Sequence, residues 1–251
     1  MNTKHYATAP EDKIPLSQKI AFGAGMLGNQ MFPAALAIFM VVLVKGLGMD
    51  PMLWGILFFL PRLFDAITDP IMGFISDNTN SRWGRRRPYV FIGAIIAGTF
   101  YIIMWQVYPE NSQTFNFTYF LLTSMVSYLG LTIFSTPYVA MGYEMSNDFH
   151  ERTRLMGVAQ WIGQWAWVIV PWFWVIIYDP EIYESATAGA RNLSIWVGGI
   201  CMCLAIVPAI FCRTPPVDPS TQVELSRKNI GKNTRSMLKG FADTFKCKPF
   251  R

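Results

Sequence analysis

Six long apolar stretches, separated by short polar gaps, constrain the fold of this chain more than any other feature of its sequence. Each is about 20 residues long or longer, which is enough for a helix to cross a hydrocarbon core of roughly 30 Å. A soluble helix of this length rarely stays apolar on all its faces. The sequence therefore predicts an all-α membrane protein with six transmembrane helices, at about residues 21–44, 52–75, 88–107, 117–141, 156–178 and 193–212.

The basic residues set the expected orientation, because Lys and Arg gather on the cytoplasmic side of a membrane. With the N-terminus inside, 18 of the 21 basic residues lie in cytoplasmic segments, and only Lys45 and Arg191 lie in outer gaps. We therefore expect a cytoplasmic tail at residues 1–18, a membrane bundle at 19–212 and a cytoplasmic loop at 213–251, in a cytoplasmic (inner) membrane. This bias and contact with anionic lipid headgroups account for the net charge of +5, so no nucleic-acid partner is expected.

The second apolar stretch carries three ionisable residues, Arg62, Asp65 and Asp69, in the run PRLFDAITDPIMGFISD. On a helix the three lie within about 60° on one face. An ionisable group at mid-membrane costs roughly 2.5–3.5 kcal/mol on insertion scales, so the two carboxylates are retained for a reason. Carboxylates one turn apart can chelate a hard cation such as Na⁺ or share a proton. A structural ion pair between Arg62 and one aspartate is the alternative.

Polar side chains also interrupt the first, fourth and fifth apolar stretches. The fourth carries hydroxyls within an arc of about 100°, and the fifth places amides beside tryptophans. Amides and hydroxyls bond sugar hydroxyls, and an aromatic ring packs against the apolar face of a pyranose. The sequence predicts a sugar site here, with hydrogen bonds between helices as the alternative. Its candidate residues are Asn29, Gln30, Tyr128, Ser135, Gln160, Gln164 and Trp161.

The segment RLFDAITDPIMGFISDNTNSRWGRRRP resembles the signature of the glycoside–pentoside–hexuronide:cation symporters, the melibiose permease-like branch of the major facilitator superfamily. The superfamily pattern of Gly, Asp and Gly-Arg-Arg falls on Gly73, Asp77, Gly84, Arg85 and Arg86. The resemblance runs over about residues 16–178. It implies two six-helix halves with the substrate between them, so this chain is expected to be the N-terminal half, truncated before a seventh helix.

The resemblance implies a cation site on the second and fourth helices. Asp65 and Asp69 match the cation-binding carboxylates of the family, and Thr132 matches a threonine that helps to ligate the ion. Thr68 stands where melibiose permease has an asparagine, which keeps an oxygen and leaves both Na⁺ and H⁺ open as the coupling ion. Ser135 stands where that permease has a third carboxylate.

At the sugar site the resemblance implies a loss of charge. Gln30 replaces an aspartate, Gln160 an arginine and Asn29 a lysine of the permease. The site stays polar but carries no charge of its own. This favours an uncharged glycoside over a hexuronate, which would require a nearby cation.

The loop after the second helix resembles the cytoplasmic gate of the superfamily, a charge network that stabilises the outward-facing state. The gating residues are expected to be Arg62, Gly73, Asp77, Arg85 and Arg86, with Glu144, Arg152 and Arg154 as candidates to join them. The alternative for these arginines is a role in setting the membrane orientation alone.

The expected function is the uptake of a sugar or glycoside, driven by Na⁺ or H⁺ and without another cofactor. A carrier of lysolipids or other amphiphiles is one alternative, because relatives of this branch carry lipids. A non-transporting membrane anchor or receptor subunit is another. An enzyme is not expected, since His5 and His150 lie outside the apolar stretches and no nucleophile–base or metal-ligand spacing occurs.

Overall fold

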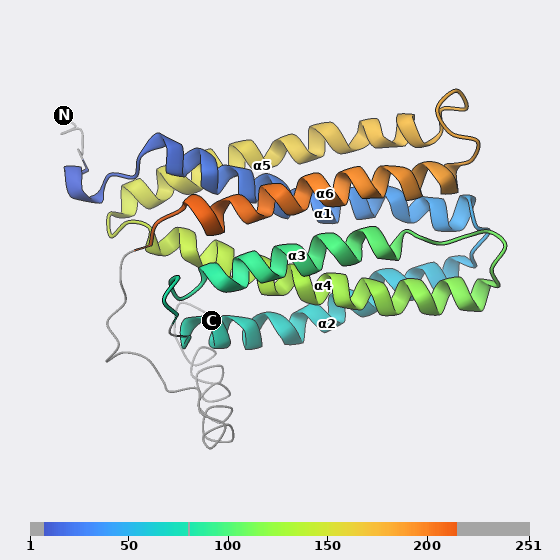
Figure 1. Ribbon diagram of the computed structural model, residues 1–251, viewed down its shortest axis with the longest axis horizontal. Coiled ribbons are helices and arrows are strands. Elements are labelled where there is room, and N and C mark those ends of the chain that lie inside the picture. Colours follow the sequence, from blue (N-terminus) through green and yellow to red (C-terminus); the bar gives the residue numbers. More distant parts are fainter. Residues whose placement is uncertain (1–7, 80, 215–251) are drawn as a thin grey trace, which may run out of the picture.

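The computed structural model describes residues 8–79 and 81–214, whose regular secondary structure is all helical (Figure 1). The described chain contains a short 3-10 helix, η1 (Pro10–Asp12), and the helices α1 (Leu16–Lys45), α2 (Pro51–Asp77), α3 (Arg87–Met104), α4 (Gln113–Glu144), α5 (Phe149–Ile177) and α6 (Ala186–Phe211). All six α-helices are long and apolar enough to span a membrane. The six-helix membrane fold expected from the sequence is confirmed.

Most of the helices begin earlier than the apolar stretches do. Hydropathy marks only the part of a helix in the hydrocarbon, whereas polar caps fix its ends. The Asp148 carboxylate accepts a hydrogen bond of 2.8 Å from the Glu151 amide, so α5 begins at Phe149 rather than at 156. The hydroxyl of Ser185 accepts one of 3.2 Å from the Ala188 amide, so α6 begins at Ala186 rather than at 193.

Part of the expected N-terminal tail belongs to the folded body. Residues 8–18 contain η1 and the first residues of α1, which begins at Leu16. Ile14 is buried, and the Ser146 hydroxyl donates a hydrogen bond of 2.8 Å to the Asp12 carbonyl. The remainder of the expected cytoplasmic tail and most of the expected central loop, residues 1–7 and 215–251, lie outside the described residues.

The six helices pack as two related sets of three. α1 packs mainly against α5 and α6, whereas α4 packs mainly against α2 and α3, and α3 also contacts α6. This pattern is unchanged when α1–α3 are exchanged with α4–α6, as expected for a bundle built from two three-helix repeats. α2 and α5 consequently lie at opposite edges of the bundle (Figure 1).

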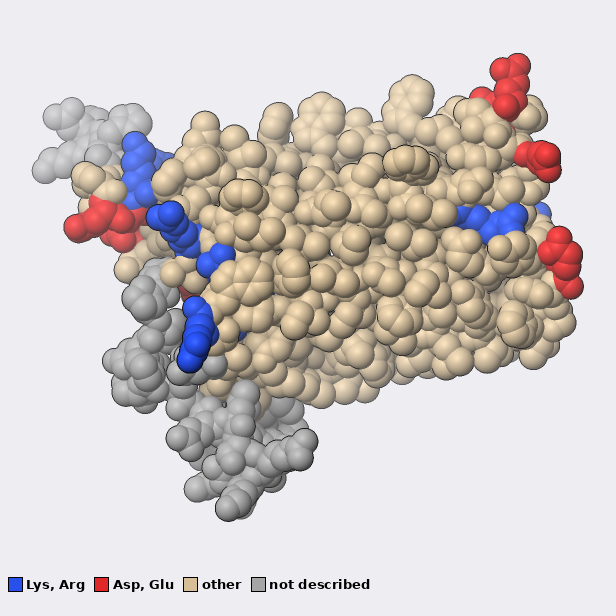
Figure 2. All heavy atoms as spheres, in the orientation of Figure 1, with Lys and Arg blue, Asp and Glu red and all other residues tan. Residues whose placement is uncertain are grey.

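On the face shown in Figure 2, charged side chains gather at the two ends of the molecule and leave a wide uncharged band between them. The helices α2 and α5 expose large apolar side chains, among them Phe59, which is 64% exposed, and Trp172, which is 66% exposed. Such a surface suits hydrocarbon or an apolar protein neighbour rather than water.

Candidate cation and solute site

α2 and α4 run in the same direction and stay in register along a shared polar face. The Thr132 hydroxyl donates a hydrogen bond of 3.1 Å to Asp65 Oδ1, and the Thr136 hydroxyl donates one of 3.3 Å to Asp69 Oδ1. Both pairs are separated by 67 residues. Because residues four apart share a helix face, two carboxylates on α2 meet two hydroxyls on α4.

Thr68 lies next to this pair of contacts without bonding to either carboxylate side chain. Its hydroxyl is 3.5 Å from the Thr132 hydroxyl and donates a hydrogen bond of 3.2 Å to the Phe64 carbonyl. The expected oxygens of Asp65, Thr68 and Thr132 are therefore adjacent. Oxygen ligands of this kind suit a hard cation.

A cavity of about 530 Å³ opens between α1, α2 and α4 over the two carboxylates. This volume falls within the roughly 300–1,000 Å³ range of small-molecule sites. Its lining is Asn29, Gln30, Pro33, Arg62, Asp65, Asp69, Leu131, Thr132, Ser135, Thr136, Val139, Ala140 and Tyr143. The structure thus brings together most of the residues expected to bind the cation and the solute.

The expected solute residues on α5 lie apart from this cavity. Gln160, Gln164 and Trp161 are exposed, Trp161 to 67%, and none of them lines the space over the carboxylates. α5 packs on α1 through small buried residues such as Ala159 and Gly163. That contact turns the two amides and the tryptophan away from the packing face.

Arg62 shares the cavity with the carboxylates but contacts an aromatic ring. Its guanidinium carbon lies over the Tyr128 ring, 5.5 Å from the centroid, within the range of a cation–π contact. Among residues 8–79 and 81–214, no carboxylate lies within ion-pair distance of Arg62. The geometry therefore does not support the alternative of a structural ion pair between Arg62 and an aspartate.

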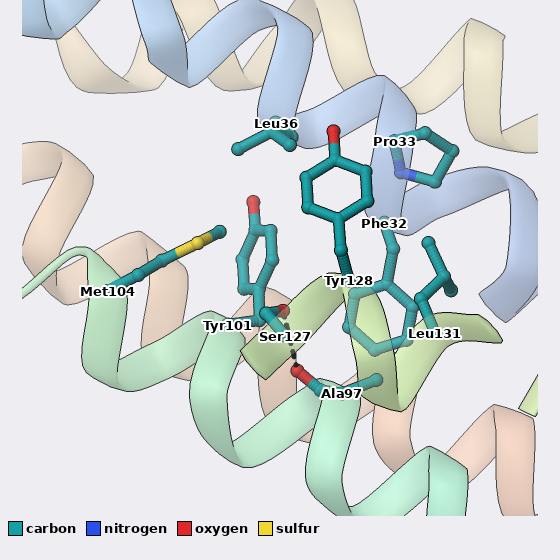
Figure 3. Close-up of a pocket in the computed structure, with 9 residues that line it drawn as sticks. All are labelled: Phe32, Pro33, Leu36, Ala97, Tyr101, Met104, Ser127, Tyr128 and Leu131. Carbon is teal, nitrogen blue, oxygen red and sulfur yellow. Dashed lines mark hydrogen bonds between the residues drawn. The ribbon is translucent and has the colours of Figure 1, made fainter. Parts of the chain in front are cut away.

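Tyr128 itself lines a second, smaller cavity of about 20 Å³ between α1, α3 and α4. Figure 3 shows its side chain pointing from α4 towards α1, beside Pro33 and Leu131, which line both cavities. The ring is 5% exposed, so it is a wall of the small cavity rather than an open ligand surface.

A charge network closes the end of the bundle that carries the loop between α2 and α3. Arg86 contacts Asp77 at 2.5 Å and Glu144 at 3.2 Å, and Arg85 also pairs with Glu144. Burial lowers the pKa of the Arg86 guanidinium, and the Asp77 carboxylate beside it opposes that shift. Gly84 makes the turn with φ of 101°, which only glycine adopts readily. The network ties the ends of α2 and α4 together.

Four of the expected gating residues lie outside this network: Arg62, Gly73, Arg152 and Arg154. Arg152 donates a hydrogen bond of 3.5 Å to the Tyr143 carbonyl, and Arg154 pairs with Glu151 at 3.3 Å. Gly73 faces α4, where an added Cβ would lie 3.7 Å from Thr136, an ordinary contact. Packing therefore gives no steric reason for glycine at that position.

The sequence reasoning left three relevant residues without a role. Thr136 binds Asp69, Tyr143 lines the cavity, and Arg87 donates hydrogen bonds of 2.6 and 2.8 Å to the last carbonyls of α6. The spacing of Thr132 and Thr136, four residues apart like Asp65 and Asp69, was the available signal for the first of these.

Comparison with known proteins agrees with this architecture. The family model described as MFS/sugar transport protein matches residues 21–251. An uncharacterized symporter of Synechocystis is 33% identical over 57% of this chain and 28% of its own length. A lactose permease of Leuconostoc lactis is 28% identical over 77% of this chain and 33% of its own length. A sodium-dependent lysophosphatidylcholine symporter of mouse is 27% identical over 57% of this chain and 28% of its own length.

The chain thus spans about a third of the length of these relatives. The family match covers all six helices and the loop with the charge network, which are the parts that carry the geometry described above. Together with its six apolar helices, this match places the chain in the major facilitator superfamily, within the sugar-transporting glycoside–pentoside–hexuronide:cation symporter family.

Proposed function

We propose that this chain forms the cation-binding half of a symporter that moves an uncharged sugar or glycoside across the inner membrane, driven by Na⁺ or H⁺. The single observation that carries the proposal is the pair of carboxylates, Asp65 and Asp69, facing one cavity with a hydroxyl bonded to each. Bare negative charge is costly at this depth in a membrane. A cation or proton neutralises it, and that change of charge is what coupling requires.

The coupling ion binds first in this mechanism. Asp65 and Asp69 on α2 hold the cation, and the Thr132 and Thr136 hydroxyls on α4 lie beside it as further oxygen ligands. Asn29 and Gln30 line the same cavity from α1, where their side-chain amides can bond the hydroxyl groups of a solute. The Asn29 amide also donates a long hydrogen bond of 3.9 Å to Met26 Sδ. The α5 amides and Trp161 take part only if the solute or a neighbouring segment reaches that edge of α1.

A neutral sugar suits this cavity better than an anionic one, because two carboxylates, Asp65 and Asp69, line it against the one guanidinium of Arg62. Asn29, Gln30, Ser135 and Tyr143 offer uncharged hydrogen-bonding groups, and Val139 and Ala140 supply an apolar flank. A lysolipid carrier remains a second candidate, since the mouse relative is named for lysophosphatidylcholine and α2 exposes a continuous apolar surface.

The test uses the protein made from its complete gene, reconstituted into liposomes. Uptake of labelled neutral sugars, beginning with lactose, is measured with an inward Na⁺ gradient, an inward H⁺ gradient or neither. We expect one gradient to drive uptake. Asp65→Asn should weaken cation binding at least about tenfold, which is a loss of ~1.4 kcal/mol, and gradient-driven uptake should fall with it. Coupled uptake that survives both Asp65→Asn and Asp69→Asn would overturn the proposal.

A matched control and a competition arm sharpen this experiment. Asp50→Asn removes a carboxylate that caps α2 at the far end of the helix, and coupling should be unchanged. Excess lysophosphatidylcholine added below its critical micelle concentration separates the two solutes. Uptake of sugar that lysolipid leaves unaffected supports the sugar, whereas cation-driven lysolipid uptake without sugar uptake supports the second candidate.

A further inference from the structure

We infer that Tyr128 is a positioning residue that holds the Arg62 guanidinium away from Asp65 and Asp69. The coupling cation then does not compete with this guanidinium for the two carboxylates. This inference rests on the proposed function of the two carboxylates. It assigns to an aromatic residue of α4 a part in setting the apparent affinity for the cation.

The first step is that Arg62 is within reach of the carboxylates. It precedes Asp65 by three residues and lies on the same face of α2, and all three side chains line one cavity. A guanidinium is the best partner for a carboxylate in a membrane-buried site, because it donates two parallel hydrogen bonds. An ion pair with Asp65 is therefore the expected default for this sequence.

The second step is that the guanidinium lies elsewhere. Its carbon lies over the Tyr128 ring, 5.5 Å from the centroid, and no ion pair to it occurs among the described residues. The hydroxyl donors of Thr132 and Thr136 occupy one oxygen of each carboxylate instead. Each carboxylate keeps its remaining acceptor capacity for an incoming ion.

The third step is that the ring is a fixed support. Tyr128 is 5% exposed, and Figure 3 shows its ring beside Pro33 and Leu36 of α1 at the small cavity. It lies one turn before Thr132 on α4, as Arg62 lies about one turn before Asp65 on α2. The Arg62–Tyr128 contact is thus the third in a row of side-chain contacts between α2 and α4. The other two are Asp65–Thr132 and Asp69–Thr136.

Removing the ring should release the guanidinium onto the carboxylates. The competing intramolecular contact would then raise the half-saturating concentration of the coupling ion. We expect Tyr128→Leu to raise it about fivefold, which corresponds to ~1 kcal/mol. Tyr128→Phe keeps the ring over which the guanidinium carbon lies and should leave the half-saturating concentration unchanged. Loss of packing is separated from release of Arg62 by repeating Tyr128→Leu in an Arg62→Gln background.

The experiment measures ion binding to the purified complete gene product, from the change in melting temperature as NaCl replaces choline chloride. If uptake identifies H⁺ as the coupling ion, tryptophan fluorescence is followed as the pH is lowered. The decisive comparison is a double-mutant cycle with Arg62→Gln. In the Arg62→Gln background, Tyr128→Leu should have no further effect, since no tethered competitor remains.

Failure of this inference is distinguishable from failure of the proposed function. If Asp65→Asn abolishes ion binding but Tyr128→Leu leaves it unchanged, or weakens it equally with and without Arg62, the inference is overturned and the function stands. If neither Na⁺ nor H⁺ binds and Asp65→Asn changes nothing, the function itself is overturned. Tyr128→Met, bulky but without a ring, carries the same expectation if Tyr128→Leu does not fold.

Discussion

The Glu151 carboxylate joins three segments of the chain far from the cation site. It is completely buried and contacts Lys19 at 2.5 Å, Arg154 at 3.3 Å and the amide of Ile14 at 3.2 Å. It therefore fastens the segment before α1 to the first turn of α5. A buried carboxylate with this many donors is stable only while its partners remain, because an unpaired charge in the interior is costly.

We predict that Glu151→Gln destabilises the folded protein by about 3 kcal/mol, because it leaves Lys19 without its buried counter-ion. The measurement is the free energy of unfolding in detergent, with Glu181→Gln as the control for an exposed carboxylate. The double variant Glu151→Gln/Lys19→Met should recover part of the loss. Equal stability of Glu151→Gln and the wild type would contradict a structural role for this carboxylate.

At the scale of the helices, packing faces decide which sequence expectations hold. Asp65 and Asp69 could be predicted to share a face from spacing alone, and the structure places both over one cavity. The same reasoning grouped Gln160 and Trp161 on α5 but could not say which neighbour α5 would meet. Its stripe of buried small residues, including Ala159 and Gly163, packs on α1 and points the polar stripe elsewhere.

Caps explain what hydropathy missed at the helix ends. Asp148 and Glu151 form a D-x-x-E pattern a few residues before an apolar run, which is the sequence signature of a helix start. This pattern predicts that α5 begins at Phe149 and that Glu151 belongs to its first turn rather than to a loop. The Arg62–Tyr128 contact had no comparable signal, since it depends on the register between α2 and α4.

The contact between α3 and α4 gives a prediction at this scale. An added Cβ at Gly130 would lie 2.5 Å from the Ala97 backbone nitrogen, so one helix must shift. We predict that Gly130→Ala lowers the free energy of unfolding by about 2 kcal/mol through overpacking. Gly199 on α6 is the matched control, because nothing lies within 4 Å of its added Cβ.

Gly199→Ala should leave thermal stability unchanged or raise it, since alanine favours helix more than glycine does. The two alanine variants are compared by melting temperature in the same detergent. Equal effects of both substitutions would argue against a close approach of α3 and α4 at Gly130.

For the whole molecule, the two ends differ in charge as well as in contacts. The end with the α2–α3 loop carries the arginine network, while at the opposite end the two basic residues rest on aromatic rings. Lys45 lies 5.6 Å from the Trp174 ring centroid and Arg191 4.1 Å from that of Tyr108. Glu110 and Glu184, in the α3–α4 and α5–α6 loops at the same end, are exposed. Because Lys and Arg rather than acidic residues set the orientation in a membrane, the end with the arginine network is the expected cytoplasmic one.

We predict that the end with Lys45 and Arg191 faces outward, because Lys and Arg gather on the cytoplasmic side of a membrane. In a background with all four cysteines replaced by serine, Glu110→Cys and Glu184→Cys should react with a membrane-impermeant maleimide in intact cells. Arg82→Cys, exposed in the α2–α3 loop, should react only after the cells are opened. The reverse pattern would put the arginine network outside, where it could not act as a cytoplasmic gate, and the order of ion and solute binding would have to be derived again from the other face.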